Sequence, residues 1–158
     1  MIGIIPLSLA LAAPQAGTPA PAPAPAASYG APIPLAEAQR LLDRALASAR
    51  TKGLQMAVAI VEPDGNLVAF ARLDDTQYGS IMVAQGKAAT AARFRRPTSA
   101  FAQSLANSPA ALSLPGVIAV AGGRPIIAKG RIIGAIGVSG GTAAQDDAVA
   151  AEALGEAP

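Results

Sequence analysis

Polar side chains that could hold an anion gather where an apolar segment gives way to a helical pattern. Arg72 and Asp74 follow the apolar run, and Tyr78 and Ser80 stand at the start of the helical stretch. Backbone N–H groups at a helix start attract carboxylates and phosphates. These four residues form the core of a candidate ligand-binding site. The simpler alternative is that Asp74 or Asp75 caps the start of the helix and that Arg72 is its surface partner.

Lys87 and two glycines extend this candidate site. Lys87 lies about two turns into an alanine-rich helical pattern, where its amine either reaches an anionic ligand or extends into water. Gly122 and Gly123 precede Arg124 at a spacing that suits a β-turn, where a ligand or a neighbouring subunit can come close.

A short basic cluster ends the same helical pattern. Arg93, Arg95 and Arg96 suit the negative end of a helix dipole, so we interpret them as structural, with attraction of propionates or phosphates as the alternative. Arg72 and Lys87 are expected to contribute more to anion binding than Arg95 and Arg96 do.

The residue types that are missing exclude several kinds of chemistry. The chain has no His and no Cys, so Ser139 has no histidine to activate it, and thiolate nucleophiles, disulfides and Cys-rich metal sites are all absent. Twelve basic against ten acidic residues give a net charge of +2, which does not indicate a nucleic-acid partner. The Gly-rich segments match neither phosphate-loop motif. We therefore expect a small-molecule ligand, no metal site and no assignable catalytic residue.

The first 34 residues have the composition of an export signal and a tether. Residues 1–12 contain a short apolar run that ends in an A-x-A site, which predicts a signal peptide unless the run is only a hydrophobic tail. Residues 13–34 are rich in Pro and Ala, as in an extended linker. Residues 35–155 would then form one domain in the periplasm or secreted, with no membrane span in the mature form.

Hydrophobic periodicity within 35–155 predicts helices alternating with strand pairs. The expected elements are helix 35–52, strands 55–62 and 66–73, helices 79–94 and 97–106, strands 117–121, 125–128 and 131–139, and helix 142–154. Asp64-Gly65 predicts a hairpin turn, and Thr142 with Gln145 predicts a capping box. Hairpins separated by helices indicate an α+β fold with helices packed on an antiparallel sheet.

Several motifs within this domain follow one another in a recognisable order. They are Val58–Glu62, Asp64–Gly65, Leu67–Arg72, Lys87–Ala91, Pro97–Thr98, Gly122–Ile126 and Gly134–Gly141, the last of which reads GAIGVSGG. In order and spacing they resemble the GlcG/HbpS-like haem-binding family, to which the C-terminal domain of PduO-type proteins is related. The resemblance covers about residues 35 to 155.

The resemblance implies a profilin-like fold, with a central antiparallel sheet of about five strands and helices on its faces, assembled into a homo-oligomer. It also implies haem as a cofactor, although haem-binding members often use a histidine as axial ligand and this chain has none. The iron would then be held by Tyr78, Met56, Met82, Lys87 or water, or the porphyrin would be held by its propionates.

Three functions follow from the residues and the resemblance together. The first is an exported protein that binds haem or a similar anionic tetrapyrrole, linked to haem handling or redox sensing. The alternative is an accessory enzyme of small-molecule catabolism, using Lys87, Arg72, Asp74 and Tyr78 on a carbonyl or carboxylate substrate. The third is a structural oligomer without a ligand.

Overall fold

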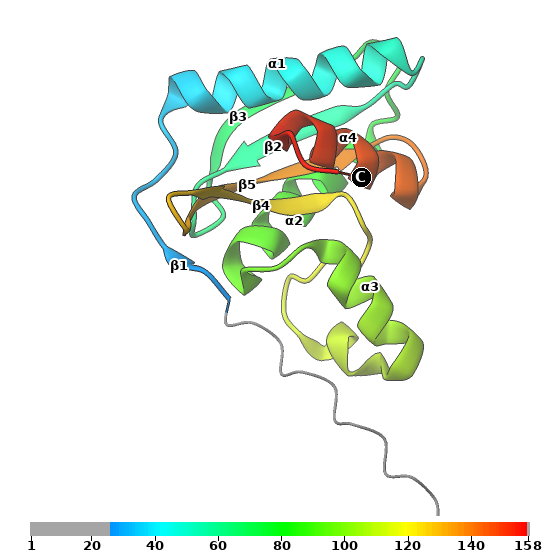
Figure 1. Ribbon diagram of the computed structural model, residues 1–158. Helices are drawn as coiled ribbons and strands as arrows, with labels where there is room; N and C mark the ends of the chain where they lie inside the picture. The colour runs from blue at the N-terminus through cyan, green and yellow to red at the C-terminus, as the bar shows by residue number, and fades with distance from the viewer. Residues whose placement is uncertain (1–25, 158) are drawn as a thin grey trace, which may run out of the picture.

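The computed structural model describes residues 26–157, and in this part of the chain helices cover both faces of a five-stranded sheet (Figure 1). The predicted signal peptide and most of the predicted linker lie outside the described residues. The strands are β1 (Ser28–Tyr29), β2 (Ala57–Val61), β3 (Leu67–Arg72), β4 (Gly123–Ala128) and β5 (Arg131–Ser139). The helices are α1 (Leu35–Thr51), α2 (Gly79–Phe94), α3 (Thr98–Asn107) and α4 (Ala143–Leu154), with a 3-10 turn η1 (Pro109–Ser113).

Strand β5 organises the sheet because it is paired along both edges. It runs antiparallel to β2 on one edge and antiparallel to β4 on the other, and β3 lies antiparallel to β2 as the hairpin partner. The short β1 pairs with the start of β5 in parallel, with Ser28 opposite Arg131. The predicted α+β architecture with about five strands is confirmed, and β1 is the one parallel member.

Helix α2 packs closely on one face of the sheet because both surfaces carry small side chains. Alanines of α2 meet Ala57, Ala59 and Ala135 of the sheet in one buried cluster. Gly137 of β5 lies directly under the helix, and a Cβ atom at that position would overlap the carbonyl oxygen of Ala84. Small residues let the helix axis approach the sheet, which fixes the position of every side chain that α2 carries.

Helices α1 and α4 cover the opposite face with larger aliphatic side chains. Val58 and Ile60 point to this side, since successive residues of a strand face opposite ways, and they pack with leucines of α1. Helix α1 ends as predicted, with Gly53 in the left-handed region at φ +66°. Lys52 then donates a hydrogen bond to Glu152 of α4 at 2.8 Å, and this contact lowers the pKa of Glu152 below its ordinary value.

The strand predicted at Val117–Ala121 is not formed. The Ile118 N–H donates to the Thr90 hydroxyl of α2 at 2.9 Å, and the Ile118 side chain lies over Gly86 of the same helix. The segment is apolar because it covers α2, not because it joins the sheet. The β-turn predicted at Gly122–Arg124 is also wrong, since Gly123 and Arg124 are the first residues of β4.

The end of the stretch predicted as linker packs on the domain. The Tyr29 hydroxyl donates to the carbonyl oxygens of Ala92 and Arg93 at 3.1 and 2.8 Å, at the C-terminal end of α2. Ile33 is buried against the core beside α1. Within residues 26–157, no helix combines the length and the apolar character that crossing a membrane requires.

Candidate functional site

Three of the predicted site residues line one surface hollow of about 430 Å³ between the end of β3 and the start of α2. We call it the Arg72 hollow, and its lining consists of Arg72, Asp74, Asp75, Thr76, Gln77 and Tyr78. The turn that shapes it is held by Thr76, which is buried and donates its hydroxyl to the Leu73 carbonyl at 2.7 Å. Asp75 takes a left-handed conformation at φ +60° in this turn.

An aromatic ring and a cation lie together at the rim of the hollow. The Arg72 guanidinium is 5.4 Å from the centre of the Tyr78 ring, and Tyr78 is 79% exposed. Met82, one turn further along α2, is 80% exposed. The Arg72 hollow therefore offers one aromatic face beside one positive charge, and its other lining residues are polar, the carboxylates of Asp74 and Asp75 among them.

Backbone N–H groups at the start of α2 are less available than the sequence suggests. The Ser80 N–H donates to the Gln77 carbonyl and the Ile81 N–H to the Tyr78 carbonyl, both at 3.1 Å. An anion at this point would depend on side chains, and on Arg72 above all.

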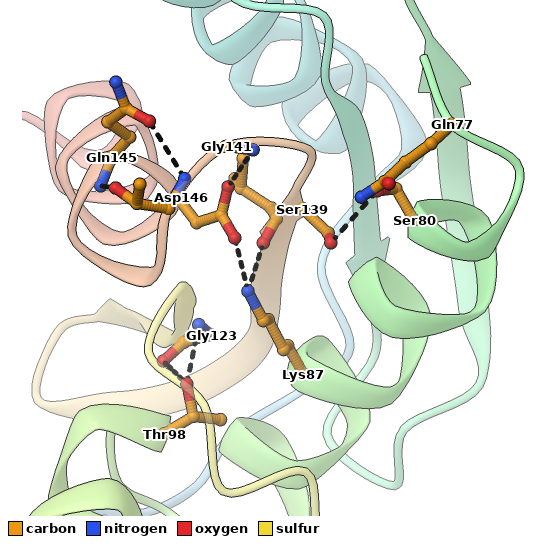
Figure 2. Close-up of polar contacts among 11 residues, drawn as sticks. Gln77, Ser80, Lys87, Thr98, Gly123, Ser139, Gly141, Gln145 and Asp146 are labelled. Atoms are coloured by element: carbon orange, nitrogen blue, oxygen red, sulfur yellow. Dashed lines mark hydrogen bonds and ion pairs between the residues drawn. The ribbon is translucent and has the colours of Figure 1, made fainter.

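Ser80 is buried next to the Arg72 hollow and takes part in a short hydrogen-bond chain (Figure 2). Its hydroxyl accepts from Gln77 Nε2 at 3.1 Å and from the Ser139 hydroxyl at 3.3 Å. Gln77 lines the Arg72 hollow, so Ser80 and Ser139 connect the hollow to the end of β5.

Lys87 is neither solvated nor free. Its side chain is 1% exposed and its ammonium lies 2.6 Å from the Asp146 carboxylate, while it also donates to the Val138 carbonyl at 3.0 Å (Figure 2). The second carboxylate oxygen of Asp146 accepts the Gly141 N–H at 2.9 Å. The expectation of an ammonium in water is therefore wrong. Contact between Lys87 and a ligand stays a prediction, and it would require this buried pair to open.

Gly122 and Gly123 make room for the ion pair. Gly122 has φ +117°, and a Cβ atom there would come within 2.8 Å of the Asp146 Cβ and 3.0 Å of the Lys87 ammonium. A Cβ on Gly123 would overlap the Lys87 carbonyl oxygen. The Gly123 N–H donates to the buried Thr98 hydroxyl at 2.9 Å. The close approach expected at these glycines is made by the protein's own α2 and α4.

The predicted site residues thus form two groups. Arg72, Asp74 and Tyr78 share the Arg72 hollow, whereas Lys87, Gly122 and Gly123 surround the buried ion pair. Ser80 lies between the groups through Ser139, the neighbour of Val138. Sequence reasoning missed the role of Asp146, which is 59 positions from Lys87 and gave no local signal beyond an acidic residue in a first helical turn.

The basic cluster at the other end of α2 makes structural contacts. Arg93 Nε donates to the Asp64 carbonyl at 2.7 Å, Arg95 lies 5.7 Å above the Tyr29 ring, and Arg96 lies 4.8 Å from the Phe101 ring centre.

Two further features bear on charge and metal binding. Arg124 pairs with Asp147, and this hydrogen bond raises the pKa of Arg124 above its ordinary value. Residues 26–157 contain no group of three acidic, His or Cys side chains placed to hold a metal ion.

Comparison with known proteins gives a consistent family assignment. Residues 33–155 match the family model described as haem degrading protein HbpS-like. An uncharacterized 15.0 kDa protein of Citrobacter freundii, from the dhaT-dhaS intergenic region, is 31% identical over 129 residues, which cover 78% of this chain and 91% of the relative. Protein GlcG of Escherichia coli K12 is 34% identical over 92 residues, 58% of this chain and 69% of GlcG.

Solved structures share the fold over most of the chain. A double mutant of Streptomyces reticuli HbpS superposes with a TM-score of 0.75 at 32% identity and covers 85% of this chain and 97% of its own. A complex of PduOC with heme has a TM-score of 0.73 at 26% identity, over 78% of this chain and 94% of that one.

Proposed function

The chain belongs to the HbpS-like family, and on this premise we propose that it is an exported protein that binds haem, or a similar anionic tetrapyrrole, at the Arg72 hollow. The proposed position of the haem site rests on one observation. An exposed aromatic ring lies beside an arginine at the rim of a hollow. A porphyrin offers a planar apolar face and two propionates. Tyr78 and Met82 suit the face, and Arg72 suits a propionate.

The donor set fits a haem that is held without histidine. Haem iron in proteins is most often held by His, Cys, Met or Tyr side chains, and this chain has neither His nor Cys. Tyr78 and Met82 carry suitable donor atoms and are exposed beside the hollow. When bound, haem would supply the redox and oxygen chemistry, while the protein residues bind and orient it.

The carboxylates of the hollow limit how an anionic ligand can lie. Asp74 and Asp75 line the same hollow as one cation, so propionates would be directed toward Arg72 and away from the two carboxylates. The ferric iron of haem carries positive charge. The two carboxylates attract this positive charge, whereas they repel the negative charge of a propionate.

The further roles proposed are haem handling and redox sensing. Similarity to PduOC, whose structure was solved as a complex with heme, supports a haem-related role. No observation favours the catabolic-enzyme alternative, because the amine of Lys87 that it would use is buried and paired.

Titration of the full chain with haemin, followed by absorption, tests the proposal. We expect a Soret shift at micromolar haemin. Arg72→Ala should weaken binding by about 10- to 100-fold, because one charge-assisted contact is worth roughly 1.5 to 3 kcal/mol. Arg95→Ala, at the opposite end of α2, is the matched control and should change binding only slightly. No Soret shift would overturn haem binding, and a larger loss for Arg95→Ala would place the site at the other end of the helix.

A further inference from the structure

A haem bound at the Arg72 hollow needs an iron ligand, and few side chains of this chain qualify. The candidates within residues 26–157 are the tyrosines, methionines and lysines, since the chain has no His or Cys. They are Tyr29, Lys52, Met56, Tyr78, Met82, Lys87 and Lys129. Their burial and contacts reduce this set sharply.

Burial removes two of the candidates that the sequence leaves open. Met56 is fully buried in the core beneath α1 and α4, and the ammonium of Lys87 is held by Asp146 and the Val138 carbonyl. Either would have to leave the packed interior to reach iron. Lys52 is paired with Glu152.

Position removes two more. The hydroxyl of Tyr29 donates to two carbonyl oxygens, and Tyr29 pairs with the beginning of β5. Lys129 lies in the turn between β4 and β5, next to the same end of β5. Arg72 lies at the other end of the sheet, because Ala57 pairs with both Arg72 and Ser139, the last residue of β5. Along eight residues of strand this separation is about 27 Å.

We infer that the phenol oxygen of Tyr78 is the axial ligand of the haem iron, with Met82 packed against the porphyrin beside it. This inference rests on the proposed function. Tyr78 is the N-cap residue of α2 and has helical backbone angles, so Met82, four positions further on, lies on the same face. An anionic oxygen suits ferric iron better than a soft thioether does, which selects Tyr78 over Met82. The Arg72 guanidinium, 5.4 Å from the ring centre, offsets the charge of a bound phenolate.

Two probes separate iron ligation from porphyrin binding. Haemin carries iron, whereas protoporphyrin IX offers the same ring and propionates without it. In the full chain, Tyr78→Phe removes one oxygen atom and keeps the ring. We expect it to abolish the phenolate-to-iron charge-transfer band and to weaken haemin binding by at least about tenfold. Its affinity for protoporphyrin IX should stay within about twofold of the unmodified chain.

The controls keep each outcome decisive. Tyr29→Phe and Met82→Leu should leave the charge-transfer band in place. Arg72→Ala should weaken the binding of both haemin and protoporphyrin IX. If the unmodified chain binds neither probe, the proposed function fails and the inference fails with it. If haemin binds and Tyr78→Phe keeps the same spectrum and affinity, only the iron ligand is misassigned. Tyr78 is exposed, so the substitution leaves the packed core unchanged.

Discussion

The Lys87–Asp146 pair lies between α2 and α4, with both side chains at most 3% exposed. Every polar atom of the pair has a partner, because the Val138 carbonyl and the Gly141 N–H complete the set. Buried ion pairs add little net stability over an apolar replacement, but losing one partner leaves a charge stranded in the interior. The pair therefore specifies how α4 docks beside the end of β5.

Lys87→Met should lower the free energy of unfolding by about 3 to 5 kcal/mol, because it strands the Asp146 carboxylate. Lys52→Met is the matched control. It breaks an exposed pair whose side chains are each 37% exposed, and it should cost at most about 1 kcal/mol. The measurement is urea denaturation followed by circular dichroism. The double variant Lys87→Met with Asp146→Leu should recover most of the loss. Equal losses of stability for Lys87→Met and Lys52→Met would contradict the interpretation.

Asp74→Asn should strengthen haemin binding by about two- to fivefold, because it removes one of two carboxylates that repel a propionate at the Arg72 hollow. Asp43→Asn, on the exposed side of α1, is the control and should leave the affinity unchanged. Haemin titrations at one ionic strength provide the comparison. Weaker binding by Asp74→Asn would show that the carboxylate contacts the ligand directly.

Helix α2 is the element that positions both groups of site residues. Its start supplies Tyr78 and Ser80, its third turn supplies Lys87, and its last turn receives Tyr29. All of these positions depend on the close contact between its alanine face and the glycine of β5 beneath it.

Gly137→Ala should destabilise the fold by about 1 to 3 kcal/mol, because the added methyl group overlaps the Ala84 carbonyl and forces α2 away from the sheet. Gly79→Ala is the matched control. A Cβ there meets no atom within 4 Å, and alanine favours the helix, so stability should be unchanged or rise by up to about 1 kcal/mol. Thermal unfolding of the two variants distinguishes these effects. A Gly137→Ala protein as stable as the unmodified chain would show that α2 has room to move.

Local signals in the sequence predicted the elements whose cause is local. The hairpin at Asp64-Gly65, the glycine that ends α1, and the capping box of Thr142 with Gln145 are all confirmed. The segment from Val117 to Ala121 was misjudged because an apolar run that covers a helix looks like one that joins a sheet. Here the deciding partner, Thr90, is 28 positions away from Ile118.

The candidate site was predicted only in part for the same reason. Adjacent positions in the chain bring Arg72, Asp74 and Tyr78 to one hollow, and the sequence grouped them correctly. The burial of Lys87 depends on α4 docking beside β5, which no spacing within α2 reveals. Its partner could be found only from the folded arrangement.

At the scale of the whole molecule, export is the first expectation to test. The mature protein should begin near Ala13, because the A-x-A site ends at Ala12. Intact mass of the protein from an envelope fraction checks this. Leu9→Arg interrupts the apolar run and should leave the chain unprocessed. Full-length protein found only in the cytosol would contradict export.

Assembly into a homo-oligomer is the second expectation. Apolar side chains are exposed between α3 and β4, among them Leu112, Leu114 and Val120, and such surfaces commonly become subunit contacts. Light scattering should give a mass that is a multiple of one chain, 15.5 kDa before processing. A single-chain mass at high protein concentration would overturn this expectation.

The hydrogen bonds from Tyr29 to the C-terminal end of α2 determine how the domain would be oriented if its N-terminal segment were attached to a surface. The chain enters the domain at the C-terminal end of α2, where the Tyr29 hydroxyl bonds to Ala92 and Arg93, while the Arg72 hollow lies at the N-terminal end of the same helix. A helix of 16 residues is about 24 Å long. A domain held by its N-terminal segment would therefore present the hollow on the side turned away from its anchorage, open to molecules that arrive from the surroundings.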